Sequence, residues 1–133
     1  MVFCISNLDI IISKRAKDKF PCPDTWTCAV GGKAKINEDI EQAALREMQE
    51  EANLQTPLKY VTSLKYKDDI HDAKFHIFTT KEAISISHLK PNPKEIQYFK
   101  ELTIKEIEDI IKYAPKTCAP SFIAVFNAFK EKF

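Results

Sequence analysis

The chain has 133 residues, 44% of them hydrophobic and 29% charged, with a formal net charge of +1. This length fits one domain over residues 1–133, and the balance is typical of a globular protein rather than a disordered or membrane protein. The small net charge disfavours nucleic acid as a partner, because proteins that bind it usually carry a basic excess. The apolar runs are too short for a membrane span or a signal peptide, so we expect a cytoplasmic protein. The four cysteines include no C-x-x-C pair and are expected to be free thiols.

The hydrophobic pattern predicts the element order β-β-β-α-β-β-β-α-α, from which we expect a mixed sheet with helices on its faces. The strands are expected at Val2–Asn7, Ile10–Ser13, Trp26–Val30, Lys59–Tyr66, Lys74–Thr80 and Glu95–Lys100. The helices are expected at about 38–52, 103–113 and 122–130, beginning at the capping residues Asn37, Thr103 and Ser121. Tight turns are predicted at Leu8-Asp9 and at 67–72, where a polar hairpin turn explains His71 among aspartates better than a metal site does.

The predicted helix 38–52 carries a cluster of carboxylates. At about 100° per residue, Glu47, Glu50 and Glu51 share an arc of about 100°, beside an apolar arc that would pack on the sheet. Three glutamates so close repel one another unless a cation neutralises them, and oxygen ligands favour a hard ion such as Mg²⁺. The alternative is a solvated, glutamate-rich helix face, which the triplet taken alone would favour. Arg46, one of only two arginines in the chain, directly precedes Glu47 and can hold a carboxylate ionised.

The wider spacing favours the metal site. From Gly32 to Leu54 the sequence reads G-x5-E-x7-R-E-M-Q-E-E-A-N-L, which resembles the Nudix box, G-x5-E-x7-R-E-U-x-E-E-x-G-U with U aliphatic. The box positions are matched by Gly32, Glu38, Arg46, Glu47, Met48, Glu50, Glu51 and Leu54. Asn53 stands in place of the second glycine. Because asparagine also tolerates a left-handed backbone, we expect one there, at a cost of about a few tenths of a kcal/mol.

The resemblance implies a Nudix-like α/β fold, a mixed β-sheet sandwiched between helices, and a catalytic Mg²⁺ with Mn²⁺ as the alternative ion. The metal ligands that it implies are the carbonyl of Gly32 and the carboxylates of Glu47, Glu50 and Glu51, with Glu95 from a late strand as a further ligand or base. Glu47 is expected to bind metal or to act as the base, and Arg46 to orient it; these two are the expected catalytic residues. Glu38 is expected to have a structural role.

The segment before the box reads K-R-A-K-D-K-F-P-C-P-D-T-W-T and resembles type I isopentenyl-diphosphate isomerases and their hydrolase relatives. By that resemblance Arg15 and Lys19 would bind the diphosphate of the substrate; the alternative is that they face solvent. Those isomerases carry a catalytic cysteine and then a metal-binding histidine after the tryptophan, where this chain has Gly31 and Lys33. The catalytic cysteine and the metal-binding histidine of the isomerases are therefore missing, while the glutamates and the arginine of the Nudix box are present.

Together these features predict a Mg²⁺-dependent hydrolase that cleaves a diphosphate linkage in a small molecule, with a nucleoside diphosphate derivative as the expected substrate. Two alternatives stay open: an enzyme like isopentenyl-diphosphate isomerase, and a catalytically idle module that binds a nucleotide. The idle module is disfavoured because such modules usually lose a box glutamate, and none is lost here. The leaving group is not encoded in the box, and a homodimer is neither indicated nor excluded.

Overall fold

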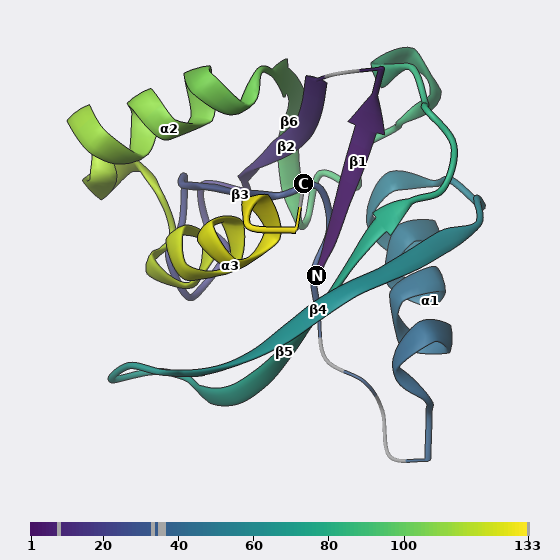
Figure 1. Cartoon of the computed structure of the whole chain (residues 1–133), viewed down its shortest axis with the longest axis horizontal. Helices are drawn as coiled ribbons and strands as arrows, with labels where there is room; N and C mark the ends of the chain where they lie inside the picture. The colour runs from purple at the N-terminus through teal and green to yellow at the C-terminus, as the bar shows by residue number, and fades with distance from the viewer. Residues whose placement is uncertain (8, 33, 35–36, 133) are drawn as a thin grey trace.

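A computed structural model describes residues 1–7, 9–32, 34 and 37–132, and six strands within them form one mixed sheet (Figure 1). The strands are β1 (Val2–Ser6), β2 (Asp9–Arg15), β3 (Trp26–Cys28), β4 (Leu58–Lys67), β5 (Asp72–Thr80) and β6 (Ile96–Leu102). The helices are α1 (Ile40–Ala52), α2 (Ile104–Tyr113) and α3 (Pro120–Lys130), with short 3-10 turns at Ile86–His88 and Pro115–Thr117. This order confirms the predicted one. No helix in the described ranges is long and apolar enough to cross a membrane.

Strand β2 organises the sheet. It pairs with β1 through its first half, with β3 through its second half and with β6 from Ile10 to Arg15, always antiparallel. From β1 the sheet continues through a parallel pairing with β5 to the antiparallel strand β4, giving the order β3-β2-β1-β5-β4. The β2–β6 register shifts between Lys14 and Arg15. Irregularities of this kind redirect side chains, and they are common beside functional sites.

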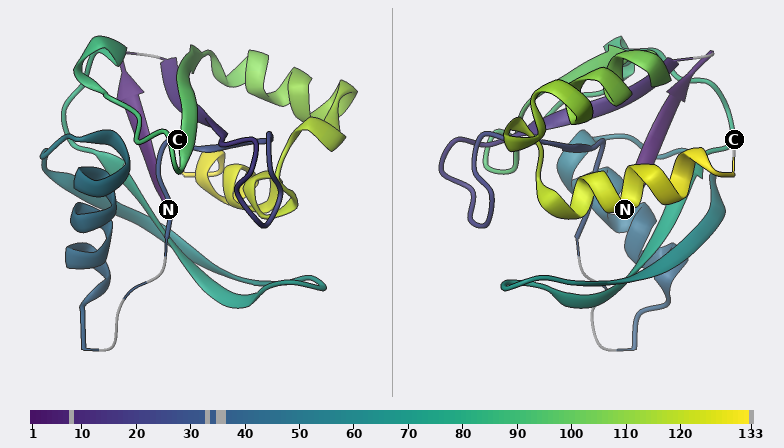
Figure 2. Two further views of the ribbon diagram at one scale, coloured as in Figure 1. Left: turned by 180° about the vertical axis from the view of Figure 1, so that it is seen from behind. Right: turned by 60° about the vertical axis from the view of Figure 1, so that its left-hand side comes forward.

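The sheet lies between helices: α1 covers one face, and α3 covers the other with α2 beside it (Figures 1 and 2). Because successive strand residues point to opposite faces, each face has its own core. Phe3 packs under α3, whereas its neighbours Val2 and Cys4 pack under α1. The helices complete the two cores with Ala44, Met48 and Ala52 from α1 and with Phe122, Val125, Phe126 and Phe129 from α3. The predicted sandwich is confirmed.

The start of α1 lies later than predicted. The sequence favoured Asn37 as the capping residue, but Asp39 caps the helix: its backbone is extended, and its Oδ1 accepts a hydrogen bond from the Gln42 amide at 2.9 Å. Asn37 has a φ of 66°, a left-handed conformation that an N-capping residue does not adopt. The predicted cap was therefore wrong, and the first helical residue is Ile40, so that Glu38 precedes the helix.

The two later helices begin in different ways. The predicted cap of α3, Ser121, was wrong, because the helix begins at Pro120 after Ala119. Proline suits the first helical position, where its fixed φ fits and its missing N–H would have no partner. At α2 the predicted capping box is confirmed: the Glu106 amide donates to Thr103 Oγ1 at 3.1 Å, and the Thr103 amide donates to Glu106 Oε1 at 2.9 Å.

The polar segment 67–72 is a hairpin turn, as predicted. Asp68 Oδ1 accepts hydrogen bonds from the amides of Ile70 and His71 at 2.8 and 2.6 Å, so the aspartate satisfies the backbone of the turn. The other predicted turn includes Leu8, which lies outside the described residues, while the antiparallel pairing of β1 with β2 on either side of it is present.

Candidate active site

Arg46 on α1 gathers carboxylates of the box. Its Nε and Nη2 donate to the two oxygens of Glu38 at 2.9 and 3.1 Å, a fork that fixes the plane of the guanidinium. Its Nη1 reaches Glu47 Oε1 at 3.0 Å and Glu50 Oε2 at 3.1 Å. The hydrogen bond to Glu38 is the main reason that the pKa of Arg46 is raised, so the side chain stays a cation. Glu38 thus anchors Arg46, and Arg46 in turn holds Glu47.

Gly32 allows Glu47 to lie against the backbone that follows β3. A Cβ atom at Gly32 would lie 2.3 Å from the carboxylate carbon of Glu47 and 2.3 Å from its Oε1, far inside van der Waals contact. At Gly31 a Cβ would meet only Cys28 and Met1, at 3.8 Å or more, which is ordinary contact. The position of Glu47 therefore requires a glycine at residue 32 and not at residue 31.

Glu51 is the buried carboxylate of the site, with only 7% of the residue exposed. Its Oε1 accepts a long hydrogen bond, 3.4 Å, from the Gly31 amide. Burial, together with the hydrogen bond and the negative charge of Glu47, raises the pKa of Glu51 to about 9. Without a cation, the Glu47–Glu51 pair therefore keeps a proton at neutral pH.

The carboxylates form a donor set that suits a hard divalent cation. Glu47 and Glu51 approach closely enough to share a hydrogen bond, and the charge of Glu95 also raises the pKa of Glu51. A divalent ion would replace the shared proton and remove the repulsion. Glu50 turns instead toward Arg46, and its side chain is 52% exposed, so it must change rotamer to join the other three. Accordingly, no three acidic, histidine or cysteine side chains of the described residues already stand in metal-binding positions.

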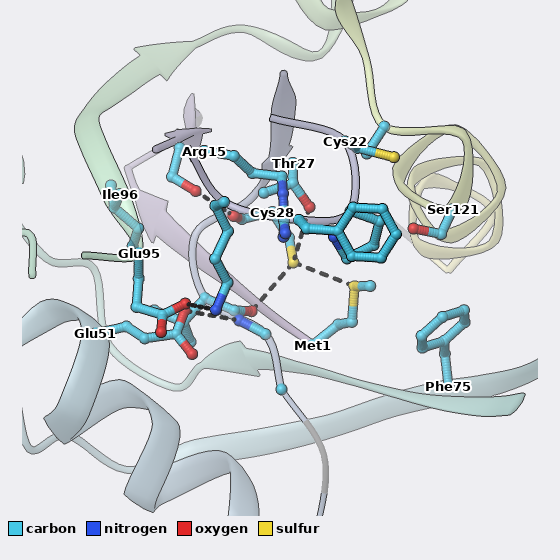
Figure 3. Close-up of a pocket in the computed structure, with 18 of the residues that line it drawn as sticks. Met1, Arg15, Cys22, Thr27, Cys28, Glu51, Phe75, Glu95, Ile96 and Ser121 are labelled. Carbon is cyan, nitrogen blue, oxygen red and sulfur yellow. Dashed lines mark hydrogen bonds and ion pairs between the residues drawn. The ribbon is translucent and has the colours of Figure 1, made fainter. Parts of the chain in front are cut away.

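A cavity of about 360 Å³ opens beside Glu51 (Figure 3). Glu51 comes from the end of α1, Glu95 from the residue before β6, and Arg15 from the end of β2. In Figure 3 the carboxylates of Glu51 and Glu95 lie together at one side of the cavity, whereas Phe75 and Ser121 lie at the opposite side. The cavity therefore has an acidic end and a more apolar end.

Two cationic side chains reach the same cavity. Lys19 Nζ contacts Glu95 Oε2 at 2.5 Å, so this ion pair stands at the acidic end. Arg15 differs, because its Nε is buried and has no hydrogen-bond partner among the described residues. A buried guanidinium N–H without an acceptor is unfavourable, and an anion in the cavity would supply the acceptor. The predicted substrate-binding residues, Arg15 and Lys19, thus line the same cavity as the predicted ligands Gly32, Glu51 and Glu95, whereas Glu47 and Glu50 do not line it.

Cys28 also lines the cavity, but it is not activated as a nucleophile. Its Sγ donates to the Val30 carbonyl at 3.1 Å, and burial raises its pKa, so it stays a neutral thiol. Gly31, at the position of the isomerases' cysteine, has no side chain, and Lys33 lies outside the described residues. All four cysteines are free, as predicted.

Sequence reasoning missed the apolar end of the cavity. Its walls come from β5 through Phe75, from the loop after β2 through Cys22, and from the start of α3 through Ser121. No spacing in the sequence relates these three positions, because they meet only through the folded sheet. Ser121, which the sequence favoured as a helix cap, is a wall residue instead.

Fold and box together define a Nudix-type domain. The NUDIX domain family model matches residues 1–120, and the chain belongs to the Nudix family. An uncharacterized Nudix hydrolase of Listeria monocytogenes is 31% identical over 110 residues, which are 79% of this chain and 63% of that protein. The match thus spans less than two-thirds of the Listeria protein. Isopentenyl-diphosphate Delta-isomerase 2 of Photorhabdus laumondii is 26% identical over 135 aligned positions, covering 95% of this chain and 73% of the isomerase.

A solved structure shows the same fold. The crystal structure of a Deinococcus radiodurans protein superposes with a TM-score of 0.83 at 17% identity, over 96% of this chain and 79% of that one. At this identity the likeness concerns the arrangement of helices and strands, and it confirms the predicted Nudix-like mixed sheet between helices.

Proposed function

We propose that this chain hydrolyses a diphosphate linkage in a small molecule, with Mg²⁺ or Mn²⁺ as cofactor, and that its substrate is a nucleoside diphosphate derivative. The observation that carries the proposal is the set of side chains that line one cavity. Glu51 is buried beside Glu47, and a cation would remove the repulsion between them. Arg15 Nε has no hydrogen-bond partner among the described residues, and an anion would supply the acceptor. A diphosphate with a divalent ion supplies both.

The residues divide into an ion-binding group and a phosphate-binding group. The ion would be held by the carboxylates of Glu47, Glu50, Glu51 and Glu95 and by the carbonyl of Gly32. When bound, the ion neutralises charge on the phosphate oxygens and makes a bound water more acidic. Arg15 and Lys19 would hold the diphosphate, Arg15 through the Nε that lacks a partner. Substrate binding would then separate Lys19 from Glu95.

The reaction needs one water and one base. Oxygen of the water bonds to one phosphorus, the bond from that phosphorus to the bridging oxygen breaks, and the bridging oxygen leaves on the other phosphate. Glu47 or Glu95 takes a proton from the water and later releases it to solvent. Arg46 contributes by holding the Glu47 carboxylate in place through its Nη1. Water is thus the only co-reactant, and both products carry phosphate.

Isomerisation of an allylic diphosphate is the second candidate, because isomerases are also among the relatives of this chain, one of them at 26% identity. That reaction delivers a proton to carbon and removes another from the opposite side. The residue that would deliver it is absent at Gly31, and the nearby Cys28 is a neutral thiol that donates its hydrogen to a backbone carbonyl. Hydrolysis instead requires a cation site, a phosphate-binding group and a base, which Glu51, Arg15 and Glu95 would supply in this cavity.

The test uses the purified chain with Mg²⁺ and a panel of nucleotides, nucleotide sugars, dinucleoside polyphosphates and prenyl diphosphates in oxygen-18 water. We expect label in one phosphate-containing product, and a loss of turnover in Glu51→Gln but not in Glu41→Gln, which changes an exposed glutamate on the same helix. In a parallel reaction, isopentenyl diphosphate in deuterated water should gain no deuterium on carbon. Deuterated dimethylallyl diphosphate, formed faster than by Glu47→Gln, would instead establish the isomerase.

A further inference from the structure

The C-terminal end of α1 is bound to the segment that leads to Glu95. Carbonyls in the last turn of a helix have no partner within the helix and need one from outside. Three of them receive one here: Ala52 from the Lys90 amide at 3.0 Å, Glu51 from the Asn92 amide at 2.9 Å, and Glu50 from Asn92 Nδ2 at 3.3 Å. The two box glutamates at the end of α1 are therefore bonded through their own backbones to segment 90–92.

Asn53 adds a side-chain bond to the same segment. Its backbone is left-handed, with φ 55° and ψ 39°, as the sequence predicted. Its Nδ2 donates to the Lys90 carbonyl at 2.8 Å. The glycine that the box has at this position would adopt the same backbone but could not make this bond. The departure from the box thus ties α1 more firmly to segment 90–92.

Asn92 carries the connection on to Glu95. Its carbonyl accepts hydrogen bonds from the amides of Glu95 and Ile96, both at 2.9 Å. A proline on each side fixes the backbone φ angles next to it. Asn92 is therefore bonded at once to the end of α1 and to the turn that delivers Glu95 into the cavity.

We propose that residues 90–95 together with Asn53, here called the clasp, hold Glu95 at a fixed distance from Glu51, and that Asn53 and Asn92 are positioning residues for the ion-binding group. The inference rests on the proposed function, since it takes Glu95 to be a ligand of the ion. Glu95 is the one member of the predicted ligand set outside the box helix and the loop before it, so its distance from the rest is set by hydrogen bonds and not by helix geometry.

A purely stabilising role for Asn53 makes a different prediction. If Asn53 only stabilised the helix end, its loss would lower the melting temperature and leave ion affinity as it is. If it acts through Glu95, its loss should weaken ion binding, and the effect should disappear once Glu95 has lost its charge. Coupling of this kind is measured by a double-mutant cycle, because residues that act on one another give non-additive changes.

The probe is Mn²⁺ alone, titrated into the full chain and followed by the electron paramagnetic resonance of the free ion. We expect Asn53→Gly to raise the Kd for Mn²⁺ about fivefold, the effect of one lost hydrogen bond. The matched control is Asn7→Gly, because Asn7 is also left-handed with φ 55° and lies between β1 and β2, outside the clasp.

The cycle is completed by Glu95→Gln and by Asn53→Gly with Glu95→Gln. We expect the double variant to bind Mn²⁺ no more weakly than Glu95→Gln. The proposed role of the clasp is contradicted if Asn53→Gly binds Mn²⁺ with the Kd of the unchanged chain. It is also contradicted if Asn53→Gly raises the Kd by the same factor in the Glu95→Gln background. The proposed function is tested separately with Glu51→Gln. If this variant binds Mn²⁺ with unchanged affinity, the proposed function is contradicted, whatever the result for the Asn53 variants.

Discussion

Gly31 and Gly32, at the start of the box, differ in whether a side chain would fit there. At Gly32 the carboxylate of Glu47 occupies the space of a Cβ atom, whereas at Gly31 that space holds only ordinary contacts. The atoms in the way at Gly32 belong to the tip of a flexible side chain. A methyl group there would therefore displace Glu47 without disturbing the backbone. Alanine variants of the two glycines therefore test whether the position of the Glu47 carboxylate matters.

We expect Gly32→Ala to lower kcat at least about tenfold, since Glu47 loses the geometry in which Arg46 holds it. Its melting temperature should stay close to that of the unchanged chain. Gly31→Ala, the matched control, should alter neither quantity. Steady-state kinetics and calorimetry on both variants check this, and equal activity of the two would show that the position of Glu47 does not matter for the reaction.

Glu50 and Glu51 are neighbours in the sequence with different surroundings. Glu51 is buried and crowded by Glu47, while Glu50 is half-exposed and held by Arg46. The helix wheel placed both on the acidic face but could not tell which is buried, because burial depends on the strands that α1 covers.

We expect Glu50→Gln and Glu51→Gln each to lower kcat at least about a hundredfold, since each removes a charge from the ion site. In the metal-free protein at pH 8, Glu51→Gln should also raise the melting temperature by at least about 2 °C, because an amide avoids the cost of a buried, crowded carboxylate. Glu50→Gln should not, given the exposure of that side chain. A third or more of the original kcat in either variant would remove that residue from the site.

At the scale of elements, the sequence predicted the type and order of the strands and helices more accurately than the residues at which the helices begin. Period and composition located all of the strands and helices, because a core face imposes a pattern over many residues. Cap residues are decided by a single hydrogen bond, and both Asn37 and Asp39 are suitable types. Asp39 was preferred in the fold because its backbone is extended, whereas Asn37 makes the left-handed turn before it.

We expect Asp39→Ala to lower the free energy of unfolding by about 1 kcal/mol, the usual effect of removing an N-cap acceptor. Asp39→Asn keeps an oxygen for the Gln42 amide and should cost much less. Urea unfolding of the two variants measures the difference. If both unfold at the same urea concentration as the unchanged chain, Asp39 does not cap α1 in solution.

The residues of the candidate site could be inferred from spacing only where one helix carries them. Helical spacing places Glu47, Glu50 and Glu51 on one face, and the wider spacing of the box favoured an ion site there over a solvated face. Arg15 and Glu95 could be named only through the resemblance, since β2 and β6 bring them near α1 by pairing with each other. The bond from Asn53 to the Lys90 carbonyl could not be foreseen at all, because it joins segments that no sequence pattern connects.

At the scale of the whole molecule, the ion site is linked to global stability. The sheet with its two cores buries Glu51, and this burial, together with the hydrogen bond and charge of Glu47, raises the pKa of Glu51 to about 9 in the absence of an ion. In the unfolded chain the same carboxyl titrates near its ordinary value of about 4.5. Between these two values the folded chain holds one proton more than the unfolded chain, so stability must fall as pH rises through this range.

We therefore expect the metal-free chain in EDTA to lose stability from pH 5 to pH 9 relative to Glu51→Gln, by at most about 1.4 kcal/mol per pH unit. The comparison isolates Glu51, since all other titrating groups are common to both proteins. Mg²⁺ replaces the proton, so the rise in melting temperature that it causes should be larger at pH 8.5 than at pH 6, and absent in Glu51→Gln. Melting curves at four pH values, with EDTA or with Mg²⁺, make the measurement. A metal-free chain whose stability follows that of Glu51→Gln at every pH would mean that Glu51 is ionised without an ion, and would remove the physical reason for placing the cation there.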